Sequence, residues 1–161
     1  MAMVTWVQQV NDSEIAALQK EPGSINRLDK PAAETFRTHY ECSINYFVTG
    51  DAYPGDHPLA SLLCGTTAIR TSTLENGAFG VSSAAEVAAM AEALAKVDVD
   101  GIRTAVAAAD FAELMEEDVD DAEILAESDD PAKTLGDEVA ELVRFYRSAA
   151  ENALGVAAYT S

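Results

Sequence analysis

The sequence is poor in basic residues. Its 161 residues contain 10 Lys and Arg against 28 Asp and Glu, which gives a formal net charge of −18. A field of that sign repels phosphate backbones and anionic lipid, so neither nucleic acid nor a membrane surface is an expected partner. The same field attracts basic proteins, and it also keeps a domain in solution.

Long apolar runs and cysteines are also scarce. No segment reaches the roughly 18 uninterrupted apolar residues that a membrane-spanning helix needs. The opening residues, MAMVTW, lack the basic-then-apolar order of an export signal. Cys42 and Cys64 are the only cysteines, and two thiols without an export signal are expected to be reduced and buried. We therefore predict a cytoplasmic protein.

The motifs of the common cofactor sites are missing. Gly77 to Gly80 is too short for a dinucleotide-binding fingerprint, and there is no phosphate-binding loop. In the acidic run 113–130, the sixth position counted from Asp118 is Glu123, whereas a calcium loop needs glycine there. These absences predict that the chain uses no cofactor.

Two clusters of soft or nucleophilic side chains were weighed as reactive sites. His39, Cys42, His57 and Cys64 lack the tight paired spacing of a structural zinc site, so we predict no metal. Cys64 with His57, and Asp56 to orient the imidazole, has no glycine-flanked elbow or helix start to activate the thiol. We predict no catalytic residue in either cluster.

The remaining sequence predicts an α+β domain spanning residues 1–161. β-rich segments lie at both ends, 4–10 and 154–159, and Asn-Gly separates two short β-prone runs, 67–73 and 77–81. Apolar residues repeat at helical spacing in several segments between them. The predicted helices cover residues 14–20, 31–48, 59–64, 83–97, 98–109 and 135–152. We expect a small sheet that includes the N- and C-terminal strands, packed by amphipathic helices.

Several short motifs together resemble the YfbM-like family of small bacterial domains. They are the helix start Val81 to Val87 with its apolar continuation to Asp98, the closing stretch 142–159, and Thr49-Gly50 followed by Pro58-Leu59 and Gly65. The resemblance covers about residues 3–159. It implies an α+β fold and a bacterial cytoplasmic protein, and it implies no particular activity.

Negative charge is concentrated in the second half of the chain. Residues 1–80 carry 5 basic and 9 acidic side chains, whereas residues 81–161 carry 5 basic and 19 acidic ones. The run 113–130 holds ten carboxylates and no basic residue, which is typical of a solvated helix face or a mobile linker. The leading hypothesis is a non-catalytic protein that recognises another, basic, protein, as a bacterial immunity protein or antitoxin does.

Two alternatives stay open. One is a small enzyme or ligand-binding domain with a cleft around residues 45–65, where Asn45, Thr49, Asp56 and His57 are the candidate binding residues. The other is a structural homodimer. The first alternative predicts a concave pocket at this loop with His57 pointing into it.

Overall fold

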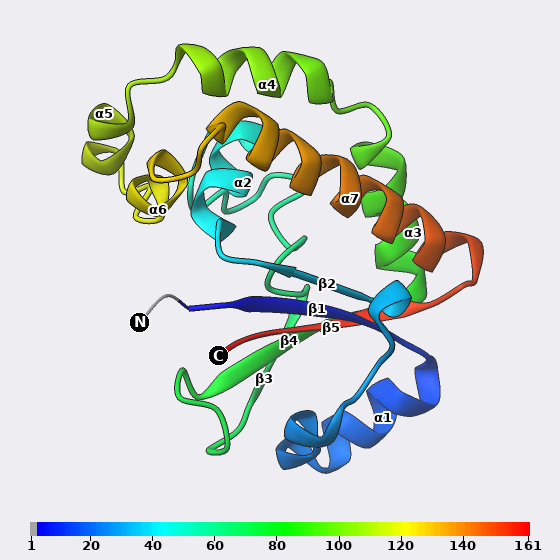
Figure 1. Cartoon of the computed structure of the whole chain (residues 1–161). Coiled ribbons are helices and arrows are strands. Elements are labelled where there is room, and N and C mark those ends of the chain that lie inside the picture. The colour runs from blue at the N-terminus through cyan, green and yellow to red at the C-terminus, as the bar shows by residue number, and fades with distance from the viewer. Residues whose placement is uncertain (1–2) are drawn as a thin grey trace.

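The computed structural model describes residues 3–161 and is built on one antiparallel sheet of five strands. The strands follow the spatial order β2-β1-β5-β4-β3. Their bounds are Thr5–Val10 for β1, Thr35–Thr38 for β2, Thr67–Arg70 for β3, Ala78–Ser82 for β4 and Gly155–Thr160 for β5. The first and last strands pair along their whole length, from Thr5 opposite Thr160 to Val10 opposite Gly155. The predicted α+β fold with its two terminal strands side by side is confirmed (Figure 1).

Seven α-helices and two short 3-10 helices join these strands within residues 3–161. The α-helices are α1 (Asp12–Lys20), α2 (Glu41–Thr49), α3 (Ala84–Leu94), α4 (Val99–Ala108), α5 (Phe111–Glu116), α6 (Ala122–Ala126) and α7 (Pro131–Glu151). The 3-10 helices are η1 (Pro22–Arg27) and η2 (Ala32–Glu34). None of the helices in this described range is long and apolar enough to cross a membrane.

The sheet has a fully covered face and a partly covered one. Helices α2, α3, α4 and α7 lie on one side, and α1 lies on the other (Figure 1). On the first side, Val7 and Phe36 pack in the main core with Leu142 of α7. On the second side, Val10 packs with Leu18 of α1 in a smaller core. Because successive strand residues alternate between faces, β1 contributes to both cores.

Helices α3 and α4 begin at side-chain caps, close to the predicted starts at residues 83 and 98. The Ser83 hydroxyl accepts from the Glu86 backbone N–H at 3.2 Å, and the Glu86 carboxylate accepts from the Ser83 N–H at 2.9 Å. This reciprocal pair is a capping box at the start of α3. The Asp98 carboxylate accepts from the Gly101 N–H at 3.0 Å and begins α4.

The single helix predicted over residues 31–48 is wrong. The segment forms η2 and strand β2, and a helix begins only at Glu41. In β2, Phe36 and Thr38 are buried while Arg37 between them is exposed, which is the two-residue period of a strand. Pairing with β1 outweighs the apolar spacing of three and four that favoured a helix. The short helix predicted over residues 59–64 is wrong as well. These residues form turns and no helix.

The acidic run 113–130 is a structured part of the domain. It contains the end of α5 and all of α6, and its apolar side chains Leu114, Val119 and Leu125 are buried. Nine of its ten carboxylate residues are exposed, and Asp121 is the buried one. The expectation of a solvated helix face describes this segment better than that of a mobile linker, because buried apolar residues fix it to the domain. We call residues 113–130 the acidic segment.

Candidate functional site

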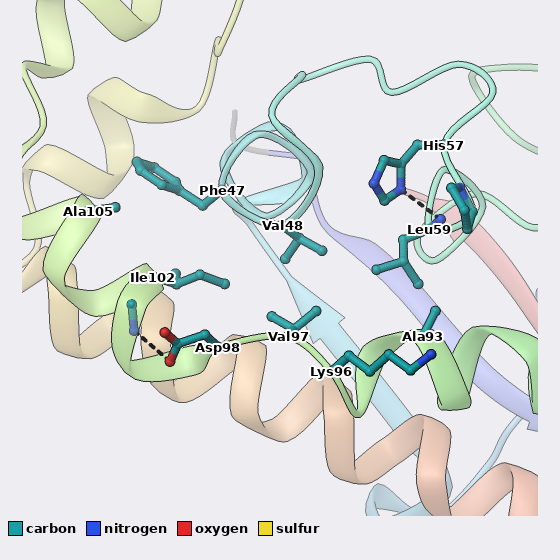
Figure 2. A pocket seen from close by; sticks show the side chains of 12 residues that line it. Phe47, Val48, His57, Leu59, Ala93, Lys96, Val97, Asp98, Ile102 and Ala105 are labelled. Atoms are coloured by element: carbon teal, nitrogen blue, oxygen red, sulfur yellow. Dashed lines mark hydrogen bonds between the residues drawn. The ribbon is translucent and has the colours of Figure 1, made fainter.

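A largely apolar cavity of about 510 Å³ lies between helix α2, the 57–59 loop and the corner from α3 to α4. Phe47 and Val48 reach it from α2, Ile102 and Ala105 from α4, and His57 from the loop (Figure 2). The complete lining is Phe47, Val48, His57, Pro58, Leu59, Ala93, Lys96, Val97, Asp98, Gly101, Ile102 and Ala105. A cavity of this size holds a small ligand or one or two side chains of a partner.

His57 lies at the edge of this cavity with one ring nitrogen already engaged. Its Nδ1 accepts a hydrogen bond from the Leu59 backbone N–H at 3.0 Å (Figure 2). An imidazole that accepts at Nδ1 carries its proton at Nε2 when neutral, so the ring offers a donor to whatever approaches. The histidine can therefore orient a bound group through one hydrogen bond.

The other ionisable side chains in this lining are Lys96 and Asp98. The Asp98 carboxylate caps α4 through the Gly101 N–H, so one of its oxygens is committed to the fold. Lys96 is exposed and can extend its apolar stem along the cavity while its ammonium group stays in water. The polar groups that this lining offers to a ligand are therefore the His57 imidazole, the Lys96 ammonium group and the remaining oxygen of Asp98.

Of the four candidates proposed from the sequence, His57 is in the lining of this cavity, and the other three are not. The Asn45 side-chain nitrogen donates to the Ala52 carbonyl at 3.3 Å, which ties the helix to the following loop. The Thr49 hydroxyl donates to the Asn45 carbonyl at 2.6 Å at the C-terminal end of α2. Asp56 is exposed on the loop. In this structure Asn45 and Thr49 hold the α2 terminus in place.

A second hollow of about 410 Å³ adjoins the first and shares Phe47 and Ala105 with it. Its floor includes Leu114, and its rim carries the carboxylates of Glu113 and Glu117. Its lining is Tyr46, Phe47, Gly50, Ala105, Ala108, Ala109, Asp110, Glu113, Leu114 and Glu117. We call the two adjoining hollows the α2–α4 groove. The groove is apolar at one end and acidic at the other.

The carboxylates of the acidic segment form no ion pair with a basic side chain among residues 3–161. Every ion pair within 4 Å that the structure shows among residues 3–161 lies outside residues 113–130. Nine exposed carboxylates therefore face water without a cationic partner, and two of them, Glu113 and Glu117, line the groove. Like charges crowded in this way raise the free energy of the free protein and favour a cationic partner.

One carboxylate attaches the acidic segment to helix α2. Asp121 accepts from the backbone N–H groups of Cys42 and Ser43 at 2.7 and 2.9 Å, and from the Ser43 hydroxyl. These N–H groups belong to the first turn of α2, which has no partner for them within the helix. Burial raises the pKa of Asp121 above its ordinary value, although its hydrogen bonds oppose that shift. Asp121 thus acts as a cap supplied from a distant part of the chain.

The two cysteines are free thiols, and Cys64 is exposed instead of buried as expected. It lies just before Gly65, in a turn that packs its backbone against Gly80 of β4 and leaves the thiol outside. Burial of part of the side chain still raises the pKa of Cys64. Among residues 3–161, no group of three or more His, Cys, Asp or Glu side chains is placed to hold a metal ion.

Sequence reasoning missed the apolar half of the groove. The segments 31–48, 83–97 and 98–109 were predicted as separate helices, and that prediction did not indicate a cavity between them. The cavity forms because α2 ends at Gly50, in a left-handed conformation with φ of 91°, and does not cover the turn between α3 and α4. The two caps, Ser83 and Asp98, were the available signals that this turn exists.

Comparison with known proteins agrees with the fold. The model of the family described as "Domain of unknown function (DUF1877)" matches residues 1–159. The crystal structure of YfbM from Escherichia coli, a protein of unknown function, is similar with a TM-score of 0.69 and 13% sequence identity. That similarity covers 98% of this chain and 99% of YfbM. None of the curated proteins matches. At this level of identity, the likeness to YfbM shows the fold alone.

Proposed function

This chain belongs to the DUF1877 family, a family without an assigned activity, and we propose from its own surface that it is a non-catalytic domain that binds a basic protein. The binding surface is the α2–α4 groove together with the acidic segment. A role in neutralising a cationic partner, as immunity proteins and antitoxins have, fits this surface.

The main observation in support of this proposal is that carboxylates without a cationic partner lie beside a cavity that is already formed. Glu113 and Glu117 edge the acidic end of the groove and have no cationic partner within 4 Å among residues 3–161. A Lys or Arg side chain of a partner would enter this end and meet both carboxylates. Complementary charge of this kind speeds association and selects the partner.

The apolar end of the groove supplies the second part of the contact. Val48, Val97 and Ile102 line it, and an apolar side chain of the partner would be removed from water there. Burial of one such side chain contributes about 1.5–3 kcal/mol. The His57 Nε2–H can donate to a backbone carbonyl of the partner next to this side chain. The predicted partner segment therefore carries a basic and an apolar residue close together.

Affinity capture from a lysate of the native cell at low salt tests the charge requirement. Wild-type protein is compared with a variant in which Glu113, Glu116 and Glu117 are all changed to Gln. We expect a basic protein to be captured by the wild type, to elute as salt is raised, and to be lost with the variant. A matched control changes Glu75, Glu92 and Glu151, which are exposed elsewhere, to Gln and removes the same charge. Equal capture by both variants would contradict a localised acidic site.

A pair of alanine variants tests the groove itself. Ala105 is exposed and lines both hollows, whereas Ala107 is exposed on the same helix and lines neither. Ala105→Gln fills the groove without changing charge, and we expect at least about a tenfold loss of affinity for the captured partner, whereas Ala107→Gln leaves it unchanged. If Ala105→Gln binds as well as the wild type, the partner uses a different surface.

A further inference from the structure

The partly covered face of the sheet holds another cavity, of about 600 Å³, which shares no lining residue with the α2–α4 groove. It lies over strands β2, β1 and β5 and is closed at one side by residues 28–32, which lead into η2. Trp6, Gln8, Arg37 and Tyr159 form its floor. We call it the sheet-face cavity.

Three side chains on neighbouring strands form a row across this floor. The strand register places Trp6 directly opposite Arg37 on one side and Tyr159 on the other. The Trp6 and Tyr159 rings are nearly parallel, at 13°, with centroids 6.3 Å apart. The Arg37 guanidinium carbon lies 5.9 Å from the centre of the Trp6 ring. The guanidinium lies over the Trp6 ring and the Tyr159 ring is stacked with Trp6, so the row brings two aromatic side chains and one cation together, which suits a planar ring that bears negative charge.

Gln8 supplies a polar group without a partner in the same cavity. It lies in the next row of β1, opposite Thr35 and Ala157, and is 4% exposed. Its Oε1 atom is buried and has no hydrogen-bond partner among residues 3–161. A buried amide oxygen left without a partner is costly, and native proteins seldom keep one without a reason. The terminal torsion of glutamine is soft, so the amide can turn to a group that enters the cavity.

The charges of the lining limit the charge that a ligand can carry. Lys30 lines the cavity but is paired with Glu14 at 2.5 Å. Arg37 has no carboxylate within 4 Å among residues 3–161, so it is the cation available to a ligand. Asp29 and Glu141 also line the cavity, and together with the net charge of −18 they oppose a polyanion. A single anionic group next to Arg37 is compatible with this arrangement.

We propose that the sheet-face cavity binds a small planar nitrogen heterocycle that carries one anionic group. The ring packs against the Trp6–Tyr159 pair, a ring N–H or amino group donates to Gln8, and the anion pairs with Arg37. Asp29 and Glu141 accept from hydroxyl or amino substituents at the rim. This site is independent of the surface proposed for the basic partner.

Tryptophan fluorescence gives a direct measurement, because Trp6 is the only tryptophan in the chain. The probes are adenosine 5′-monophosphate (AMP), adenosine, which lacks the anion, and ribose 5-phosphate, which lacks the ring. We expect AMP to quench Trp6 in a saturable way and adenosine to bind about tenfold more weakly because it loses the pair with Arg37. Ribose 5-phosphate is expected to cause no change.

Two substitutions and one control assign the effect to the cavity. Arg37→Gln is expected to weaken AMP binding about tenfold and to leave adenosine binding unchanged, whereas Arg70→Gln, an exposed change on the opposite edge strand, has no effect. Gln8→Leu is expected to raise the melting temperature of the free protein, since it removes an unpartnered oxygen, and to weaken both AMP and adenosine. A merely structural Gln8 would not change ligand binding.

Three results would overturn the proposal. They are the absence of quenching by AMP up to about 5 mM, equal affinity for AMP and ribose 5-phosphate, and AMP affinity that stays at the wild-type value in both Arg37→Gln and Gln8→Leu. Circular dichroism of each variant confirms that the fold is intact before the titration.

Discussion

The α2–α4 groove and the sheet-face cavity are built in different ways. The groove lies between helices, and its character comes from carboxylates that are close in sequence, in and next to α5. The sheet-face cavity is made by Trp6, Arg37 and Tyr159, which are far apart in sequence and meet only through strand register. A local excess of one residue type is visible in a sequence. A row of side chains across a sheet can be predicted only if the pairing of the strands is known.

The two surfaces also differ in how firmly they are held. The sheet-face cavity rests on β1, which has hydrogen-bonded neighbours on both sides. The acidic segment is held by a few buried apolar residues and by the contacts of Asp121 with the first turn of α2. The groove is therefore expected to be the more mobile surface, and the cavity the more rigid one.

Asp121→Ala is expected to have the largest effect on stability. Removing the carboxylate leaves the Cys42 and Ser43 N–H groups without their cap, and the free energy of unfolding should fall by about 1–3 kcal/mol. Hydrogen exchange should then show faster exchange in the acidic segment and unchanged exchange in β1. Asp120→Ala, an exposed neighbour, is the control. Equal effects of the two changes would show that Asp121 does not attach this segment.

We expect pH to change stability less than Asp121→Ala does, and in a direction that the shifted pKa values define. Burial raises the pKa of Glu41, of Asp121 and of Glu138 above their ordinary values. A carboxyl group with a raised pKa in the folded state gives stability that is full below its ordinary pKa and is lost as the pH rises through the raised value. The melting temperature should therefore be higher near pH 5 than near pH 8.

Glu138→Gln separates this effect from net charge. The Thr38 hydroxyl donates to Glu138, and a glutamine amide oxygen can accept the same bond without a buried charge. The variant should melt about 1–3 °C higher near pH 8 and depend less on pH than the wild type. Glu75→Gln removes an equal charge at an exposed position and should leave the pH dependence unchanged. A steeper dependence in Glu138→Gln would contradict the assignment.

The smallest change in stability is expected when three exposed carboxylates of the acidic segment are made neutral in the free protein. Changing Glu113, Glu116 and Glu117 to Gln relieves repulsion among exposed carboxylates, so stability should rise by at most about 0.5 kcal/mol. Urea unfolding measures this change. A clear loss of stability would mean that these side chains support the fold, and capture experiments with the variant would then need another explanation.

The parts of the fold that follow from local chemistry were predictable from the sequence. The capping box at Ser83 and Glu86 depends on only a few consecutive residues. The β-rich composition of the two ends is local in the same way. Strand β2 was not predictable in this way, because Phe36 and Tyr40 also fit a helical spacing, and the pairing with β1 decides between the two. Helices α5 and α6 are held in place because Leu114 and Val119 are buried against other elements. The many charged residues of this segment make that burial hard to predict from the sequence.

The candidate site was predictable only in part for the same reason. His57 was proposed from the sequence and lies at the edge of the apolar cavity. Asn45 and Thr49 were proposed with it, but their side chains bond to neighbouring backbone at the end of α2. Polar residues near a helix terminus often bond to local backbone, and the sequence alone does not separate that use from ligand binding.

The most direct test of the account is the salt dependence of the affinity between this domain and the partner that it captures. We predict that the dissociation constant of the wild type rises steeply with salt, and that the variant with Gln at positions 113, 116 and 117 binds weakly with a shallower dependence. If the wild type and this variant bind the same partner with equal affinity at low and high salt, the acidic segment is not the binding surface.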